Sequence, residues 1–201
     1  DQRLVLLNRA AKRCVDQEEI DAFLAAHPRT ADFCRFMAIR ASNGNRPWTE
    51  WSNDTIEDET LHLWQFLQYT FFRQWKKIKA YANQKGISII GDIPMYVSLN
   101  SSDVWAAPEQ FQLDRENKPL GVAGVPPDYF SADGQLWGNP LYDWKKMKSD
   151  GFTWWKDRIR FMGELFDGVR IEHFRGLDSY YYIPAGEKTA RNGKWMKGPG
   201  M

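Results

Sequence analysis

The 201-residue sequence predicts an α/β fold with a parallel sheet, and three observations lead to this prediction. Residues 58–85 have the apolar spacing of a long amphipathic helix, and a short apolar segment, residues 87–94, follows them. Residues 152–166 repeat the helical spacing ahead of an alternating segment, residues 168–173. Helices that alternate with strands are typical of parallel βα architectures. We therefore expect two successive βα units of a partial (β/α)8 TIM barrel.

The N-terminal part of the sequence predicts shorter helices. Residues 2–27 have the spacing of two helices, and Asp16 with Glu19 matches a capping box. Residues 30–42 predict a third helix with Thr30 as its N-cap. In the long helix we expect an apolar stripe to face a sheet. That stripe comprises Leu61, Trp64, Leu67, Phe71, Trp75, Ile78 and Tyr81.

Composition excludes several classes of function. A net charge of +1 offers no basic surface for nucleic acid or an anionic membrane. No apolar segment has the length of a membrane span, and no signal peptide is evident. The two cysteines, Cys14 and Cys34, lie in predicted helices without metal-ligand spacing, so we expect no metal, no cofactor and a reducing, cytoplasmic location. Because the chain begins at Asp1 and ends within Gly198–Met201, we expect a fragment.

Residues 95–150 have no clear helical or strand period, and we expect them to be an inserted loop region. Loops of this length in a compact domain are usually functional or disordered, and this one is too aromatic for disorder. Pro126 and Pro127 stiffen the backbone before the residues 128–130. The segment is therefore predicted to cover a substrate. The tail, residues 180–200, is predicted to be a second loop.

Charged residues stand at the ends of the two predicted strands. Asp92 ends the first strand, and the carboxyl ends of parallel strands are where barrel enzymes hold their chemistry. Arg170 and Glu172 share one face of the second strand, because successive side chains alternate. A carboxylate beside a guanidinium is suited to attack a sugar carbon while a second carboxylic acid protonates the leaving oxygen. A structural salt bridge is an equal alternative from these residues alone.

Three motifs together resemble one enzyme family. They are Gly91-Asp92-Ile93-Pro94, the segment from Ala123 to Trp144 (AGVPPDYFS followed by GQLWGNPLY), and Val169 to Gly176 (VRIEHFRG). These motifs resemble the 4-α-glucanotransferases, also called amylomaltases or disproportionating enzymes, of the α-amylase superfamily. The resemblance extends over residues 30–201 and implies a (β/α)8 barrel. It also implies a retaining double displacement that moves segments of α-1,4-glucans between malto-oligosaccharides.

The resemblance also implies roles for individual residues. Glu172 occupies the position of the nucleophile, with Arg170 as its partner, and Asp92 is expected to contact the sugar in the first donor subsite. Asp128, Tyr129 and Phe130 belong to the loop over the active site, with Trp137 and Asn139 near it. His173 follows the nucleophile position, and alternation places it on the opposite face of the strand.

Two departures from the family pattern limit this interpretation. The family has Asp where this sequence has Glu172, and the added methylene moves the carboxylate by roughly 1 Å, enough to cost about a hundredfold in rate. The family's general acid and third carboxylate are expected beyond residue 201. We therefore expect the 201-residue chain alone to have no transferase activity. A non-catalytic glucan-binding relative is the main alternative, and a hydrolase is a weaker one. Exposed strand edges also predict self-association.

Overall fold

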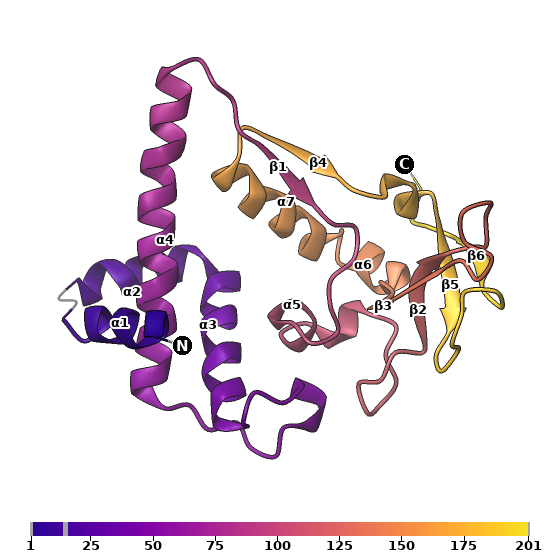
Figure 1. Ribbon diagram of the computed structural model, residues 1–201, viewed down its shortest axis with the longest axis horizontal. Coiled ribbons are helices and arrows are strands. Elements are labelled where there is room, and N and C mark those ends of the chain that lie inside the picture. The colour runs from indigo at the N-terminus through magenta and orange to yellow at the C-terminus, as the bar shows by residue number, and fades with distance from the viewer. Residues whose placement is uncertain (1, 14–15, 201) are drawn as a thin grey trace. The chain divides into compact units, whose positions relative to one another are not determined.

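The computed structural model describes residues 2–13 and 16–200, so the predicted helical position of Cys14 lies outside the described residues. The described chain forms two compact units, one up to Ile87 and one from Ser88 onward (Figure 1). Each unit has its own core.

The N-terminal unit consists of helices, as the spacing of the apolar residues predicted. Its elements are α1 (Gln2–Ala11), α2 (Gln17–Ala26), α3 (Pro28–Ser42), the 3₁₀ helix η1 (Trp48–Glu50) and α4 (Asp58–Gln84). Helices α1, α2 and α3 pack on α4, and Figure 1 shows them along one half of its length. The central cluster of this unit consists of Ile20, Leu24, Cys34 and Tyr69.

Two predicted helix caps are wrong. Asp16 precedes α2 but its side chain makes no capping hydrogen bond, and the Glu19 carboxylate accepts a hydrogen bond from the hydroxyl of Tyr69 instead. Helix α3 begins at Pro28, and Thr30 is buried within its first turn. Proline is favoured at the first helical position, because the N–H that it lacks would have no partner within the helix.

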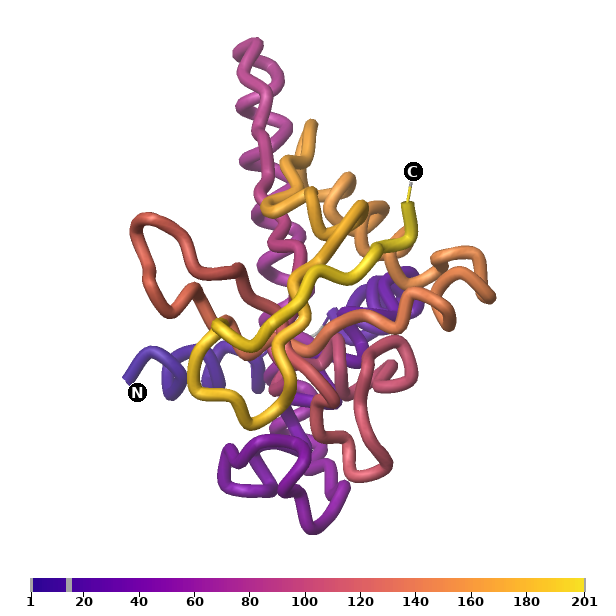
Figure 2. Tube along the Cα trace, turned by 90° about the vertical axis from the view of Figure 1, so that its right-hand side faces the viewer, coloured from indigo at the N-terminus to yellow at the C-terminus, as the bar shows by residue number. Residues whose placement is uncertain are grey.

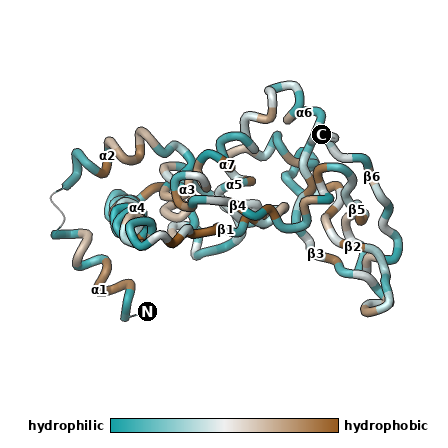
Figure 3. Tube along the Cα trace, turned by 90° about the horizontal axis from the view of Figure 1, so that it is seen from above, coloured by the Kyte–Doolittle hydropathy of each residue, from teal (hydrophilic) through white to brown (hydrophobic). Residues whose placement is uncertain are grey.

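The predicted apolar stripe of α4 is only partly correct. The buried residues of this helix are Tyr69 and Phe72, whereas Phe71, Ile78 and Tyr81 are exposed. In Figure 3, which looks along α4, hydrophilic residues colour much of the helix. Because α4 contacts three helices of its unit and no sheet there, its buried face differs from the one that sheet packing would select.

Both histidines of this unit make structural contacts. The ring of His27 packs on Phe23 and Phe72, with Nδ1 2.7 Å from the carbonyl oxygen of Phe23. Aromatic packing and this contact therefore hold His27 between α2 and α3. His62 lies with Nε2 3.1 Å from the carbonyl oxygen of Ala11, which agrees with a structural role.

The C-terminal unit contains the predicted parallel strand pair. Strand β1 (Ile90–Ile93) pairs with β4 (Gly168–Ile171) in parallel, and Asp92 lies opposite Arg170. Helix α7 (Thr153–Leu165) packs on both strands. A Cβ at Gly91 would lie 2.2 Å from the ring of Phe166, so only glycine permits this close approach. Both strands are shorter than predicted, and among the described residues they form a two-stranded sheet, not a closed barrel.

The segments predicted as loops contain regular structure, which corrects the description of residues 95–150 and 180–200. A second, antiparallel sheet has the strand order β3-β2-β5-β6. Its strands are β2 (Gly121–Val125), β3 (Gln135–Pro140), β5 (Ser179–Pro184) and β6 (Lys194–Lys197). The same region holds α5 (Ser102–Trp105), η2 (Pro108–Gln110) and α6 (Trp144–Ser149). These strands are short and interrupted by glycine and proline, and β2 pairs with a strand some sixty residues later, so no local period marks them.

Aromatic side chains hold this unit together around Tyr142. Its ring contacts Phe111, Trp154 and Trp155, and its hydroxyl donates a 2.6 Å hydrogen bond to the carbonyl oxygen of Met95. The guanidinium of Arg158 lies over both tryptophan rings. This core fixes the chain segment that leaves the carboxyl end of β1.

In the parts of the chain that the structure describes, no helix combines the length and the apolar character needed to cross a membrane.

Candidate active site

Three charged side chains meet at the carboxyl ends of β1 and β4. Arg170 donates two hydrogen bonds to Asp92, one from Nε to Oδ1 at 3.0 Å and one from a terminal nitrogen to Oδ2. Its terminal nitrogen also lies 3.7 Å from a carboxylate oxygen of Glu172. All three side chains are about half exposed, at 49% for Asp92, 65% for Arg170 and 53% for Glu172. One guanidinium therefore bridges two carboxylates that a ligand can reach.

Asp92 and Arg170 each stabilise the charged form of the other. Hydrogen bonds from Arg170 lower the pKa of the Asp92 carboxyl, with smaller contributions from the charge of Arg170 and a backbone hydrogen bond at Ile93. In turn, the hydrogen bonds to Asp92 and its negative charge raise the pKa of the Arg170 guanidinium. Because a lowered pKa keeps a carboxylate charged, Asp92 presents an anion at the strand end over the neutral pH range.

Glu172 stands directly after the last residue of β4. Its backbone N–H donates a 3.0 Å hydrogen bond to the carbonyl oxygen of Ile93, which continues the ladder between the two strands. Its contact with Arg170 confirms that these two side chains lie on the same side of the strand. The sequence predicted that Arg170 and Glu172 share one side, and the hydrogen bonds of Arg170 to Asp92 come from the pairing of the two strands.

The strand alternation from which the position of His173 was predicted does not extend to this residue. The strand ends at Ile171, and His173 has a left-handed backbone with φ of 52°, so the alternation of a strand no longer applies. The reversed chain brings the imidazole onto the ring of Trp137, with 4.5 Å between the ring centroids. His173 and Trp137, predicted separately, thus form one surface.

The residues predicted to cover the site lie on the turn that connects β2 with β3. Asp128 Oδ1 accepts hydrogen bonds from the backbone N–H groups of Phe130 and Ser131, at 2.9 and 2.8 Å. This turn leaves Tyr129 and Phe130 almost fully exposed, at 97% and 92%. Figure 2 shows the connection extending away from the strands as an open loop. Asp128 therefore shapes the loop, and the two rings are its exposed tip.

Asn139 has a structural contact near the site. Its side-chain nitrogen donates a 2.9 Å hydrogen bond to the carbonyl oxygen of Val97, in the segment that follows β1. This bond ties β3 to the chain that leaves Asp92. Among the described residues, no hydrogen bond, ion pair or ring contact joins residues 128–130 to Asp92, Arg170 or Glu172.

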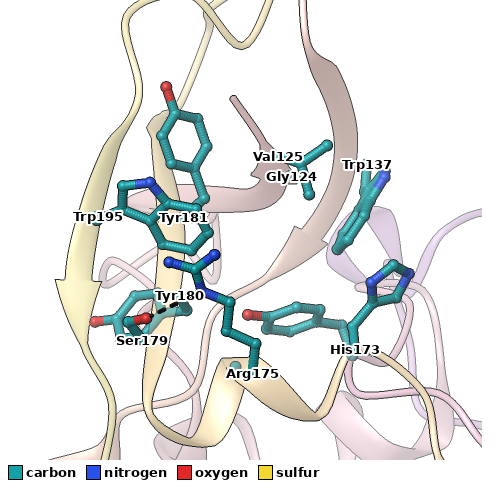
Figure 4. A pocket seen from close by; sticks show the side chains of 11 residues that line it. Gly124, Val125, Trp137, His173, Arg175, Ser179, Tyr180, Tyr181 and Trp195 are labelled. Carbon is teal, nitrogen blue, oxygen red and sulfur yellow. Dashed lines mark hydrogen bonds between the residues drawn. The ribbon is translucent and has the colours of Figure 1, made fainter. Parts of the chain in front are cut away.

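An open pocket of aromatic and polar side chains lies beside the strand ends (Figure 4). His173 and Trp137 line one side of it, and Trp195 and Tyr181 line the other, with Arg175 between them. Tyr96 also lines the pocket, where burial raises the pKa of its hydroxyl and the neighbouring Tyr180 adds to that effect. Flat aromatic faces with a few hydrogen-bonding groups are typical of sugar sites.

Of the residues that line this pocket, the sequence indicated Trp137 and His173, and the side chains that it did not indicate include Tyr96, Arg175, Tyr181 and Trp195. Two of them, Tyr181 and Trp195, lie on strands that were predicted to be a loop. Two features of the sequence could have indicated these residues. They are the arginine within the motif Val169–Gly176 and the many aromatic residues in the segment 180–200. Among the residues that the structure describes, no group of His, Cys, Asp and Glu is arranged to hold a metal ion.

The fold and the sequence both match known proteins. A family model described as 4-alpha-glucanotransferase matches residues 2–201. The chain is 44% identical to the 4-alpha-glucanotransferase of Synechocystis sp., a match that covers 100% of this chain and 45% of that protein. It is also 44% identical to the 4-alpha-glucanotransferase of Aquifex aeolicus, over 97% of this chain and 43% of that protein. The chain thus spans less than half the length of the curated relatives it matches.

Two solved structures share the fold. The amylomaltase from Streptococcus agalactiae, solved in complex with acarbose, superposes with a TM-score of 0.87 at 41% identity, over 94% of this chain and 41% of that one. The amylomaltase from Corynebacterium glutamicum superposes with a TM-score of 0.80 at 19% identity, over 98% of this chain and 27% of that one, and this likeness concerns the fold alone. Because the family model extends over nearly every residue, and relatives match the whole length of the chain, this chain belongs to the 4-alpha-glucanotransferase family.

Proposed function

We propose that the protein containing this chain transfers segments of α-1,4-glucans between malto-oligosaccharides. The observation that carries the proposal is the Asp92–Arg170–Glu172 cluster at the carboxyl ends of two parallel strands, in a chain of this family. The acarbose complex of the related amylomaltase supports malto-oligosaccharides as its ligands. Incubating the full-length protein with maltotriose tests the proposal, which expects glucose together with a ladder of longer products.

In this mechanism Glu172 acts as the nucleophile. Its carboxylate forms a bond to the anomeric carbon while the bond to the leaving 4-oxygen breaks, and a carboxylic acid from elsewhere in the protein protonates that oxygen. In the second step the 4-hydroxyl of another glucan attacks the same carbon, the acid group now takes its proton, and Glu172 leaves. Arg170 holds Glu172 and Asp92 at a fixed separation. Asp92 accepts hydrogen bonds from sugar hydroxyls in the first donor subsite.

The aromatic residues are proposed to bind and enclose the glucan. Trp137 and His173 present adjacent rings beside the nucleophile position, and Tyr129 and Phe130 are exposed at the loop tip, where a sugar chain can reach them. Enclosing the site excludes water and favours a sugar hydroxyl as acceptor, which supports transfer over hydrolysis. Asp128 and Asn139 would then act by shaping the enclosing segments.

The proposed function requires a longer protein than these 201 residues. We propose that this chain is part of a longer one, that residues 1–201 contribute to one (β/α)8 barrel, and that the region 95–150 covers the substrate. The coverage of the relatives, at 45% and 43%, supports this. A cytoplasmic location and the absence of nucleic-acid and membrane partners remain predictions from composition.

The 201-residue chain alone is expected to show no transfer. Its charged cluster contains Glu172 and Asp92, but the family resemblance assigns the acid that protonates the leaving oxygen to a later part of the sequence. We expect purified chain and maltotriose to give no glucose above a protein-free blank over hours. Full-length protein at equal concentration is the positive control, and turnover by the chain alone would contradict the prediction.

The chain alone is also expected to self-associate. Among the described residues β1 and β4 pair only with each other, so each has an edge with unpaired backbone groups, and Ile90 on β1 is 64% exposed. Static light scattering should show a mass above 23.5 kDa that rises with concentration. Ile90→Lys should reduce the association, because edge lysines oppose strand pairing, whereas the exposed Leu120→Lys should not. A constant monomer mass for the unaltered chain would refute this.

A non-catalytic glucan-binding protein is the second candidate function. The observation in its favour is Glu172, which stands where the resemblance implies Asp. Such a protein would retain the aromatic pocket and bind maltodextrins without forming new ones. Variants of Glu172 separate the two functions, because a binding protein forms no products longer than the substrate until Glu172 is replaced by Asp.

A further inference from the structure

We propose that Arg175 is a positioning residue, which fixes the turn after β4 and thereby sets where Glu172 and His173 lie. The inference rests on the proposed function, in which Glu172 is the nucleophile. Arg175 itself is three residues beyond Glu172 and contacts the second sheet, so its effect on the reaction passes through the backbone.

The turn that carries Glu172 has a backbone conformation that needs support. The strand ends at Ile171, His173 has φ of 52° and ψ of 39°, and the short 3₁₀ helix η3 (Phe174–Leu177) follows. A residue with a side chain rarely adopts this left-handed region, and it persists where surrounding contacts impose it. The position of Glu172 therefore depends on whatever holds η3 in place.

The far end of η3 is held by the backbone. Gly198 N–H donates a 2.6 Å hydrogen bond to the carbonyl oxygen of Asp178, and Gly200 N–H donates one of 3.1 Å to that of Leu177. Gly176 is buried, and a Cβ added there would lie 3.1 Å from the side chain of Met95. These contacts fix the end of η3 that lies away from Glu172.

The end of η3 nearer to Glu172 is held by the side chain of Arg175. Its guanidinium carbon lies 4.0 Å from the centroid of the Trp195 ring, on β6, and its Nε donates a 3.4 Å hydrogen bond to Ser179 Oγ, where β5 begins (Figure 4). Tyr181 meets Trp195 edge-on at 5.3 Å and supports the ring from β5. A guanidinium this close to an indole face is attracted by the ring quadrupole.

Within the described residues no carboxylate forms an ion pair with Arg175. Its contacts are the Trp195 face and the Ser179 hydroxyl, so removing the guanidinium should free the turn without leaving an anion unpaired. The loop from Glu172 to Phe174 then keeps its connection to β4, the contact of His173 with Trp137 and the backbone bonds at the far end of η3, but no side-chain anchor at Arg175. A carboxylate displaced by about 1 Å can cost about a hundredfold in rate.

Arg175 also lines the pocket, so a direct contact with the glucan is the competing explanation. The two roles differ in kinetics. Loss of a binding contact made equally in ground and transition states raises KM and leaves kcat unchanged, whereas loss of positioning lowers kcat.

The test uses the full-length protein with Arg175→Met, Arg175→Lys, Trp195→Leu and Trp195→Phe. Arg160→Met is the matched control, because Arg160 is an exposed arginine paired with Asp157 on α7. We expect Arg175→Met to lower kcat by about a hundredfold, with KM changed by less than about twofold, and Trp195→Leu to lower kcat to a similar extent. Arg175→Lys and Trp195→Phe keep part of the cation–aromatic contact and should be intermediate. Arg160→Met should match the unaltered protein.

Hydrogen–deuterium exchange gives a readout that does not need activity. Amides of residues 173–178 should exchange at least about tenfold faster in Arg175→Met than in Arg160→Met, because the turn has lost an anchor. Thermal unfolding measured alongside shows whether the variants remain folded.

Three results would overturn the inference. They are an unchanged kcat and unchanged exchange in Arg175→Met, a rise in KM alone, or a loss of kcat that only follows a loss of folded protein. If the unaltered protein forms no products from maltotriose, the proposed function fails, and the exchange measurement still decides whether Arg175 holds the turn.

Discussion

Glu172→Asp in the full-length protein is expected to raise kcat for maltotriose disproportionation by about a hundredfold, and Glu172→Gln to abolish it. The reason is geometric, because the family resemblance implies a site arranged around the shorter Asp side chain. A methylene moves the carboxylate by roughly 1 Å, and a misplacement of that size costs about a hundredfold. Gln has the shape of Glu but cannot form the covalent intermediate, so the loss should be on the order of 10⁴-fold or more.

The activity of both variants is measured from the release of glucose and the formation of longer maltodextrins over time. Arg160→Met serves as a control for effects of surface substitution. A ladder from the unaltered protein means that Glu172 is a working nucleophile, and a ladder from Glu172→Asp alone favours the non-catalytic binding protein. If neither the unaltered protein nor Glu172→Asp forms products, the proposed function loses its main support. Activity that survives in Glu172→Gln would show that Glu172 is not the nucleophile.

Arg170→Met is expected to lower kcat by on the order of a hundredfold, because Arg170 bridges both carboxylates of the site. Without the guanidinium, Asp92 and Glu172 repel each other and lose the element that fixes their separation. Arg170→Lys keeps the charge but not the paired donors that reach both Asp92 oxygens. Its kcat should therefore lie between the kcat of the unaltered protein and that of Arg170→Met. Arg160→Met, which removes an arginine of similar exposure, should have no effect.

The same substitution should shift the acid limb of the kcat profile upward in pH. Arg170 lowers the pKa of Asp92 from 3.8, so Asp92 in the unaltered protein stays charged to lower pH than a free carboxyl. The stability contributed by the pair is present above about pH 3.8 and is lost as pH falls through the lowered pKa. In Arg170→Met the pKa of Asp92 returns toward its ordinary value. An acid limb that does not move would contradict a role for charged Asp92.

Local sequence patterns determined the helices and the charged cluster of this protein. The apolar spacing in residues 58–85 and 152–166 gave helices with nearly correct bounds, because the period of a helix is set by neighbouring residues. The alternation in residues 168–172 put Arg170 and Glu172 on one side, and the parallel βα pattern put Asp92 beside them. Each of these features depends on contacts within a few residues or on the regular geometry of strands.

The tertiary structure alone decided the second sheet, the buried face of α4 and the surroundings of Glu172. Strands β2 and β5 pair across some sixty residues, and no local period shows such a pairing. Glu19 could not cap its helix because Tyr69, fifty residues away, holds its carboxylate. His173 turns onto Trp137, and Arg175 reaches Trp195, because the chain reverses at a single left-handed residue. The sequence thus determined which charged residues stand at the strand ends, and long-range packing decided where the side chains around them lie.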